Sequence, residues 1–115
     1  MKKTKSLKKN KDFKEIYSTG VSYANKNLVM YIRKNGTDEN RLGISVSKKI
    51  GNSVVRHRIT RLIRESYRLN EESVIKGLDI VVVARIGAKE KSYFEIEGSL
   101  LHLMKLHGIL VNKSS

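Results

Sequence analysis

Residues 55–68 constrain this chain more than any other segment, because they form a helical pattern with one apolar side and one cationic side. At about 100° per residue, the apolar side gathers Val55, Ile59, Leu62, Ile63 and Ser66. The opposite side gathers His57, Arg61, Arg64 and Arg68. Five of the thirteen residues from Arg56 to Arg68 are arginine, and Glu65 is the single acid among them. A face of this kind predicts contact with phosphates, which guanidinium groups bind in bidentate fashion. A merely solvated face is the alternative interpretation.

The whole chain has the same bias, with a net charge of +13 on 115 residues. The excess lies in the first two-thirds, because residues 69–115 carry six basic and six acidic side chains. Such a charge favours a nucleic acid as partner. We expect no membrane partner, since the basic segments lack the bulky apolar face that would lie in lipid and no apolar run approaches the ~20 residues that span a bilayer. We also expect no small-molecule substrate. Without cysteine there is no disulfide framework and no thiol nucleophile. We therefore expect a cytoplasmic protein.

The periodicity predicts one domain over residues 1–115, with a flexible basic tail at 1–9 and a flexible end at 112–115. A short helix should follow Asn10 or Asp12 as N-cap, with Glu15 completing a capping box from Asp12. Gly20 should end this helix. Residues 28–34 and 41–49 alternate as strands, and the polar turn 35–40 between them suggests a hairpin.

The second half of the chain predicts a helix, a strand and a further helix. Asn52 or Ser53 can cap the basic helix at 54–69, and residues 78–86 are typical of a central strand that is buried on both faces. Ser92 and Glu95 predict a capping box before a last helix. Its core stripe should contain Ile96, Leu100, Leu103 and Leu106. The result is an α+β class fold, a single-domain α-β sandwich of order α-β-β-(β)-α-β-α.

Residues 41–64 resemble the protein subunit of bacterial ribonuclease P, in which a strand ending in a serine-lysine pattern precedes a helix of regularly spaced arginines. The matching positions are Gly43, Ser45, Ser47, Lys48, Lys49, Gly51, Asn52, Arg56, Arg58, Arg61 and Arg64. His57 and Thr60 stand where that family usually has asparagine and lysine. The resemblance also takes in residues 7–10, 12–13 and 80–85, and so it extends over most of the chain.

The resemblance implies an accessory subunit of an RNA enzyme that removes the 5′ leader of precursor tRNA. Catalysis would belong to the RNA, which requires magnesium, so no catalytic residue, metal site or cofactor is expected in the protein. The residues assigned to the ribonuclease P RNA are Lys48, Lys49, Asn52, Arg56, His57, Arg58, Arg61, Arg64 and Arg68. Those assigned to the leader, in a cleft between the first helix and the sheet, are Phe13, Tyr17, Tyr31, Arg33, Ser45 and Ser47. The family also implies an unusual left-handed βαβ crossover, against the right-handed default.

Two alternatives stay open at this point. Phe13 and Tyr17 stand at i, i+4, a spacing that ordinary core packing explains without any ligand. A non-catalytic ribosomal or other nucleic-acid-binding protein would carry a similar charge. A nuclease acting by itself would need converging carboxylates for metal ions. The acids here are dispersed, with Asp38 and Glu39 in a turn and Asp79 isolated at a strand entry.

Overall fold

The apolar run at residues 78–84 forms β5 (Leu78–Ala84), the middle strand of a five-stranded sheet of order β1-β4-β5-β3-β2. The computed structural model describes residues 3–111. β5 pairs in parallel with β4 (Asn40–Ser45) and antiparallel with β3 (Leu28–Lys34). The outer strands are β1 (Thr4–Ser6) and β2 (Val21–Ala24). A strand with six of its seven residues buried must be covered on both faces, so the predicted central position is confirmed.

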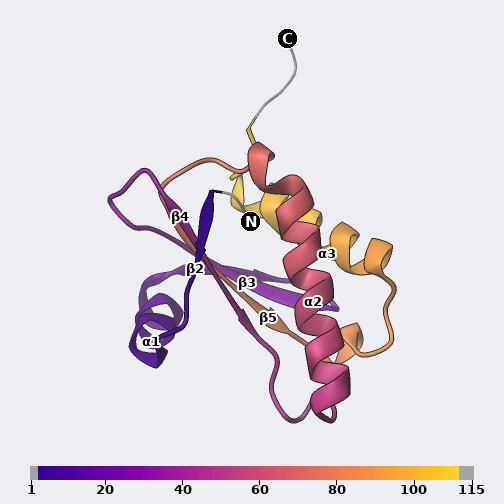
Figure 1. Cartoon of the computed structure of the whole chain (residues 1–115). Coiled ribbons are helices and arrows are strands. Elements are labelled where there is room, and N and C mark those ends of the chain that lie inside the picture. The colour runs from indigo at the N-terminus through magenta and orange to yellow at the C-terminus, as the bar shows by residue number, and fades with distance from the viewer. Residues whose placement is uncertain (1–2, 112–115) are drawn as a thin grey trace.

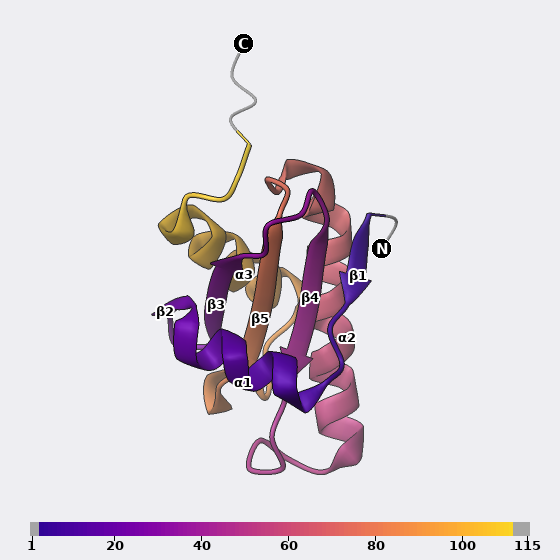
Figure 2. The same ribbon diagram turned by 90° about the vertical axis from the view of Figure 1, so that its left-hand side faces the viewer.

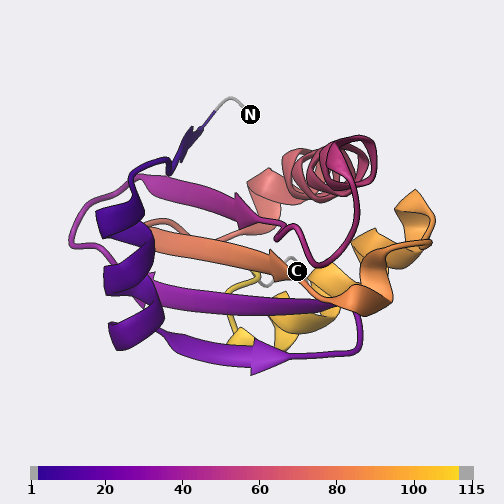
Figure 3. The ribbon, with the colours of Figure 1, turned by 90° about the horizontal axis from the view of Figure 1, so that it is seen from below.

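The helices and the sheet form three layers (Figure 1), and two apolar cores lie between these layers. Helix α1 (Asn10–Thr19) crosses one face of the sheet, and α2 (Ser53–Asn70) and α3 (Tyr93–His107) cover the other (Figures 2 and 3). Short 3₁₀ turns at Glu71–Ser73 and Ile86–Ala88 flank β5. The larger core lies between the sheet and α2 and α3, and the smaller one centres on Leu7, Ile16 and Val81. The predicted α+β sandwich is confirmed, with β2 as its additional strand. The implied left-handed β4–α2–β5 crossover stays a prediction.

The expected hairpin between residues 28–34 and 41–49 is wrong, because β5 lies between β3 and β4. β4 is also shorter than predicted and ends at Ser45. The polar turn reverses the chain without pairing the two strands. The side chain of Asn40 links the start of β4 to the start of β5 and to the residues before it. It donates to the carbonyl of Ile75 and accepts from the amide of Leu78, each at 2.9 Å. The apolar β5 is most stable between two other strands, and its position there keeps β3 and β4 from pairing as the local turn predicts.

The expected flexible tail at residues 1–9 is wrong for its described part. Thr4–Ser6 forms β1 parallel to β4, and Leu7 is buried. The hydroxyl of Thr4 lies 2.8 Å from that of Tyr67, a fully buried residue of α2. Backbone pairing and the burial of Leu7 therefore offset the repulsion among the lysines. Residues 1–2, and the expected flexible end at 112–115, lie outside the described residues.

The helix ends match the predictions in part. Asn52 caps α2 by accepting from the amide of Val55 at 3.0 Å, and Ser92 with Glu95 forms the expected capping box of α3. Helix α1 begins after Lys9 without any side-chain cap, so the predicted caps at Asn10 or Asp12 are wrong. Its end at Gly20 is confirmed.

The apolar stripe of α3 differs from the prediction at its C-terminal end. Ile96, Leu100 and Leu103 are fully buried as expected, but Leu106 is 46% exposed. Met104, also fully buried, takes the place expected for Leu106. These two residues stand at opposite edges of the stripe, each roughly 80° from Ile96 around the helix. The Met104 edge packs into the larger core, and helical periodicity alone cannot decide which of the two edges does so.

Candidate nucleic-acid interface

Helix α2 presents the predicted cationic face to solvent. Ile59, Ile63 and Ser66 point into the core, whereas His57, Arg61 and Arg64 are exposed. Within residues 3–111, none of these three exposed side chains has a hydrogen-bond or ion-pair partner. Lys48 and Lys49 are likewise exposed, in the turn that leads into the helix. The core thus fixes the helix from one side and leaves its charges available on the other.

Other residues of the predicted RNA-binding set have partners inside the protein. Arg58 donates to the backbone carbonyls of Lys89 at 3.3 Å and Lys91 at 2.6 Å, which ties α2 to the loop before α3. Arg68 forms an ion pair with Glu65, with Nε 3.0 Å from Oε2. The hydrogen bond from Arg68 is the main cause that lowers the pKa of Glu65. The side chain of Asn52 serves as the cap of α2.

Arg56 differs from its neighbours on α2, because its side chain is half-buried. Its Nε is buried and finds no partner within the described residues. A buried donor without a partner costs free energy, and an acceptor from outside the chain would remove that cost.

A groove of about 490 Å³ lies between α1 and the end of β4. Its walls include Phe13 and Tyr17 from α1 and Ile44, Ser45 and Val46 from the other side. Tyr17 is 39% exposed and meets Tyr31 edge-on, with ring centroids 4.9 Å apart. Of the six residues assigned to the leader, the structure therefore brings Phe13, Tyr17 and Ser45 onto one groove with Tyr31 behind them. Ser47 is not buried and stands beyond the end of β4, outside the lining of this groove.

Phe13 combines the two sequence interpretations. It packs on the smaller core beside Leu7, Ile16 and Val81, and it also lines the groove. The missing side chain of Gly43 permits this position, because a Cβ there would lie 2.6 Å from Cζ of Phe13. The small residue at position 43 thus lets α1 approach this face of β4 closely.

The groove continues beyond Phe13 toward α2. A second hollow, of about 300 Å³, shares Phe13 and Ile44 with the first and is also lined by Lys8 and Arg64. Sequence reasoning assigned Lys8 to a flexible tail and so missed its position at this site. Arg64 thus belongs to the cationic face of α2 and also lines the second hollow.

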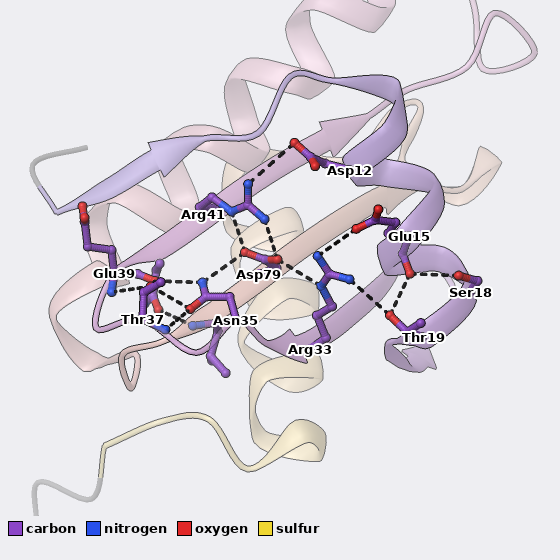
Figure 4. Close-up of polar contacts among 12 residues, drawn as sticks. Asp12, Glu15, Ser18, Thr19, Arg33, Asn35, Thr37, Glu39, Arg41 and Asp79 are labelled. Atoms are coloured by element: carbon purple, nitrogen blue, oxygen red, sulfur yellow. Dashed lines mark hydrogen bonds and ion pairs between the residues drawn. The ribbon is translucent and has the colours of Figure 1, made fainter.

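Arg33 lies in a charged cluster under α1 (Figure 4). Its Nε donates to Oδ2 of Asp79 at 3.1 Å, and its Nη2 lies 3.5 Å from Oε2 of Glu15. Arg41 binds Asp79 with two bonds of 2.7 Å and lies 3.6 Å from Asp12. The guanidinium of Arg33 is therefore engaged inside the protein, and its contact with a leader stays a prediction.

Asp79 is fully buried at the centre of this cluster. Burial would raise the pKa of this carboxyl, but hydrogen bonds from Arg41, Asn35 and Arg33 outweigh that effect and hold the pKa below its ordinary value. Sequence reasoning treated Asp79 as isolated. An acid at the entry of an otherwise apolar strand, with arginines on two other strands, was the available signal for a buried cluster.

Within the described residues, histidines and acids form no group of three or more that could hold a metal ion. The helices of the same part of the chain include none long and apolar enough to cross a membrane.

Comparison with known proteins decides the family, because the family model described as Ribonuclease P matches residues 1–107. The chain belongs to the ribonuclease P protein family. The ribonuclease P protein component of Lachnoclostridium phytofermentans is 62% identical over 107 residues, which is 93% of this chain and 92% of the relative. The component of Clostridium botulinum strain Langeland is 51% identical over 108 residues, 93% of this chain and 97% of the relative.

Solved ribonuclease P proteins share the fold. The protein from Staphylococcus aureus matches with a TM-score of 0.84 and 43% identity, covering 90% of this chain and 95% of that one. The protein from Thermotoga maritima matches with a TM-score of 0.82 and 35% identity, covering 89% and 96%. The resemblance seen in residues 41–64 is confirmed. Membership of the ribonuclease P family connects the chain to tRNA processing, as an RNA-binding protein that partners the ribonuclease P RNA.

Proposed function

We propose that this chain binds the catalytic RNA of ribonuclease P through α2 and guides the 5′ leader of precursor tRNA along the groove beside α1. The observation that carries the proposal is the cationic face of α2, where His57, Arg61 and Arg64 are exposed, without partners in the described part of the chain, on a helix fixed by its buried side. Folded RNA presents phosphates at close spacing, and each phosphate that a cation neutralises releases counterions.

The start of α2 supports the same partner. Lys48 and Lys49 precede the helix, and its N-terminal amides carry the positive end of the helix dipole. Asn52 caps these amides and so defines where the helix begins. A phosphate near this end would meet both the lysines and the dipole.

The groove suits a single strand. Bases without a partner strand stack on aromatic rings with little sequence preference, which a leader of variable sequence requires. Phe13 and Tyr17 supply the rings, and Ser45 adds a hydroxyl on the opposite wall. The continuation to Lys8 and Arg64 offers cations for the backbone of the same strand and joins the groove to the RNA-binding face.

We assign hydrolysis to the RNA subunit, with magnesium ions held by the RNA, and place the reaction in the cytoplasm. The carboxylates nearest the groove have other partners. Asp79 accepts hydrogen bonds from three side chains, and Asp12 and Glu15 face Arg41 and Arg33. These pairs favour a structural role over proton transfer or metal binding.

Reconstitution tests the proposal. The purified chain is mixed with a bacterial ribonuclease P RNA at low magnesium, and leader removal and the affinities for precursor and mature tRNA are measured. We expect the protein to restore cleavage and to tighten precursor over mature tRNA. A double variant Arg61→Ala with Arg64→Ala should lose the effect, whereas Lys105→Ala on α3, which removes a charge elsewhere, should keep it. Wild-type protein that neither restores cleavage nor favours the precursor would refute the proposal.

A further inference from the structure

A pocket of about 320 Å³ lies between α2 and the start of α3. The residues that line it are Arg61, Leu62, Arg64, Glu65 and Tyr93. We propose that this pocket holds one unpaired nucleotide of the RNA, with the base against the Tyr93 ring and the phosphate on Arg61 and Arg64. The inference rests on the proposed function, in which α2 faces the ribonuclease P RNA, and it adds a site on α3 for a flipped-out base.

Tyr93 is fixed in place before any ligand binds. It is the first residue of α3, directly after the capping residue Ser92, and its hydroxyl donates to Oε2 of Glu97 at 3.1 Å. Its ring also meets that of Phe94 edge-on, with centroids 5.5 Å apart. An aromatic ring held by such contacts loses little conformational entropy when a base stacks on it.

Arg58 holds the loop that places Tyr93 beside α2. Its guanidinium donates to the carbonyls of Lys89 and Lys91, in the short segment that leads into the helix. Lys91 also lies 3.8 Å from Glu95 in the first turn of α3. The arginine-rich helix therefore builds one wall of the pocket and, through Arg58, positions the other.

The charges around the pocket select a nucleotide. Arg61 and Arg64 have no partner within the described residues, whereas the acid that lines the pocket, Glu65, is paired with Arg68. The pocket thus offers two available cations beside the apolar surfaces of Leu62 and Tyr93. An unpaired nucleotide presents the matching combination of a phosphate and a planar base, and proteins recognise single-stranded RNA by such stacking on aromatic rings.

Affinity for a bacterial ribonuclease P RNA tests the pocket at several salt concentrations. Tyr93→Leu should bind roughly 5- to 100-fold more weakly, the range expected for loss of one base-stacking contact. Its salt slope should equal that of the wild type, because no phosphate contact is lost. Tyr93→Phe should bind within about twofold of the wild type, since the ring remains. Tyr23→Leu is the matched control, because Tyr23 on β2 is 44% exposed and lies outside the pocket, and it should bind like the wild type.

A second measurement does not depend on the stability of Tyr93→Leu. The chain contains no tryptophan, so Tyr93→Trp introduces a single fluorescent reporter at the pocket. Saturating RNA should quench the indole of Tyr93→Trp strongly and leave that of Tyr23→Trp nearly unchanged. The pocket would be refuted if the indole of Tyr93→Trp stayed unquenched in the saturated complex. It would also be refuted if Tyr93→Leu bound the RNA with wild-type affinity while Arg61→Ala bound it more weakly. Either result would leave the proposed function standing. Failure of the wild-type chain to bind the RNA at all would refute the proposed function itself.

Discussion

Arg41 of β4 holds Asp79 of the neighbouring strand β5 through two hydrogen bonds, Nε to Oδ1 and Nη2 to Oδ2, each 2.7 Å long. Arg33 of β3 binds the same carboxylate at 3.1 Å. Both arginines also face acids of α1, Asp12 and Glu15. This cluster fixes α1 on the sheet (Figure 4). It therefore also fixes the groove wall that carries Phe13 and Tyr17.

Replacing Asp79 should destabilise the fold strongly. Asp79→Ala leaves two partly buried guanidinium groups without their shared partner, and we expect a loss of about 3–5 kcal/mol in the free energy of unfolding. Urea denaturation at pH 7 measures it. Asp38→Ala, which removes an exposed acid from the turn before β4, is the control and should stay within about 0.5 kcal/mol of the wild type. A loss of similar size in both variants would contradict a special role for the cluster.

The Asp79 carboxylate should also make the free energy of unfolding depend on pH. The pKa of Asp79 is lowered in the folded state, so the unfolded chain binds the proton more readily. Its contribution is therefore complete above the ordinary pKa of aspartate, about 3.9, and is lost as the pH falls through the folded value. We expect the stability difference between wild type and Asp79→Asn to be constant from pH 7 to about pH 5 and to shrink below about pH 4. Urea titrations at each pH measure it, and a constant difference down to pH 3 would refute the expectation.

Substitutions of two arginines of α2 should affect RNA binding and folding stability differently. Arg61→Ala should weaken binding to the ribonuclease P RNA and reduce the salt slope by about 1, with a nearly unchanged melting temperature, because Arg61 has no partner among the described residues. Arg58→Ala should lower stability by about 1 kcal/mol, since it removes two hydrogen bonds to the loop before α3. Filter binding and thermal unfolding of both variants provide the comparison. Equal loss of stability in the two would show that Arg61 is structural as well.

A methyl group at Gly43 should disturb the groove. Gly43→Ala places a Cβ 2.6 Å from Cζ of Phe13, and overpacking of this kind costs about 1–3 kcal/mol. Because the ring must move, affinity for precursor tRNA should also fall. Gly98→Ala in α3 is the matched control. A Cβ there meets nothing within 4 Å, and the substitution should stabilise the helix by about 0.5–1 kcal/mol. Unchanged stability of Gly43→Ala would mean that α1 can shift freely on the sheet.

Two exposed tyrosines allow a test of leader binding. Tyr17→Ala should reduce the preference for precursor over mature tRNA by roughly 5- to 100-fold, as expected for the loss of one stacked base. Tyr23→Ala on β2 removes a ring of similar exposure, 44% against 39%, outside the groove, and should leave the preference unchanged. Competition binding between the two tRNAs measures both. If Tyr23→Ala had the larger effect, the leader would have to follow another path.

Local patterns predicted the elements whose signals lie close together in the chain. The stripe of Ile59 and Ile63 and the opposing arginines define α2, since both follow from helical periodicity alone. The capping box of Ser92 and Glu95 is equally local, and the apolar run that forms β5 implies a central strand. Residues 41–64 were sufficient to indicate the family.

The tertiary structure decided what depends on partners distant in sequence. Thr4 belongs to a strand because β4 and Tyr67 lie beside it, and Tyr67 is 63 positions away from Thr4 in the sequence. Asp79 is a structural anchor because two strands bring Arg33 and Arg41 to it. Among the cations of α2, sequence alone could not distinguish Arg58, bound to loop carbonyls, from Arg61, which has no partner in the described part of the chain, because both stand on the same helix with the same chemistry. The sequence thus determined which surface is cationic. The packing of the loop before α3 against α2 determined that Arg58 is bound while Arg61 remains available, since a hydrogen bond depends on distance in space rather than on position along the chain.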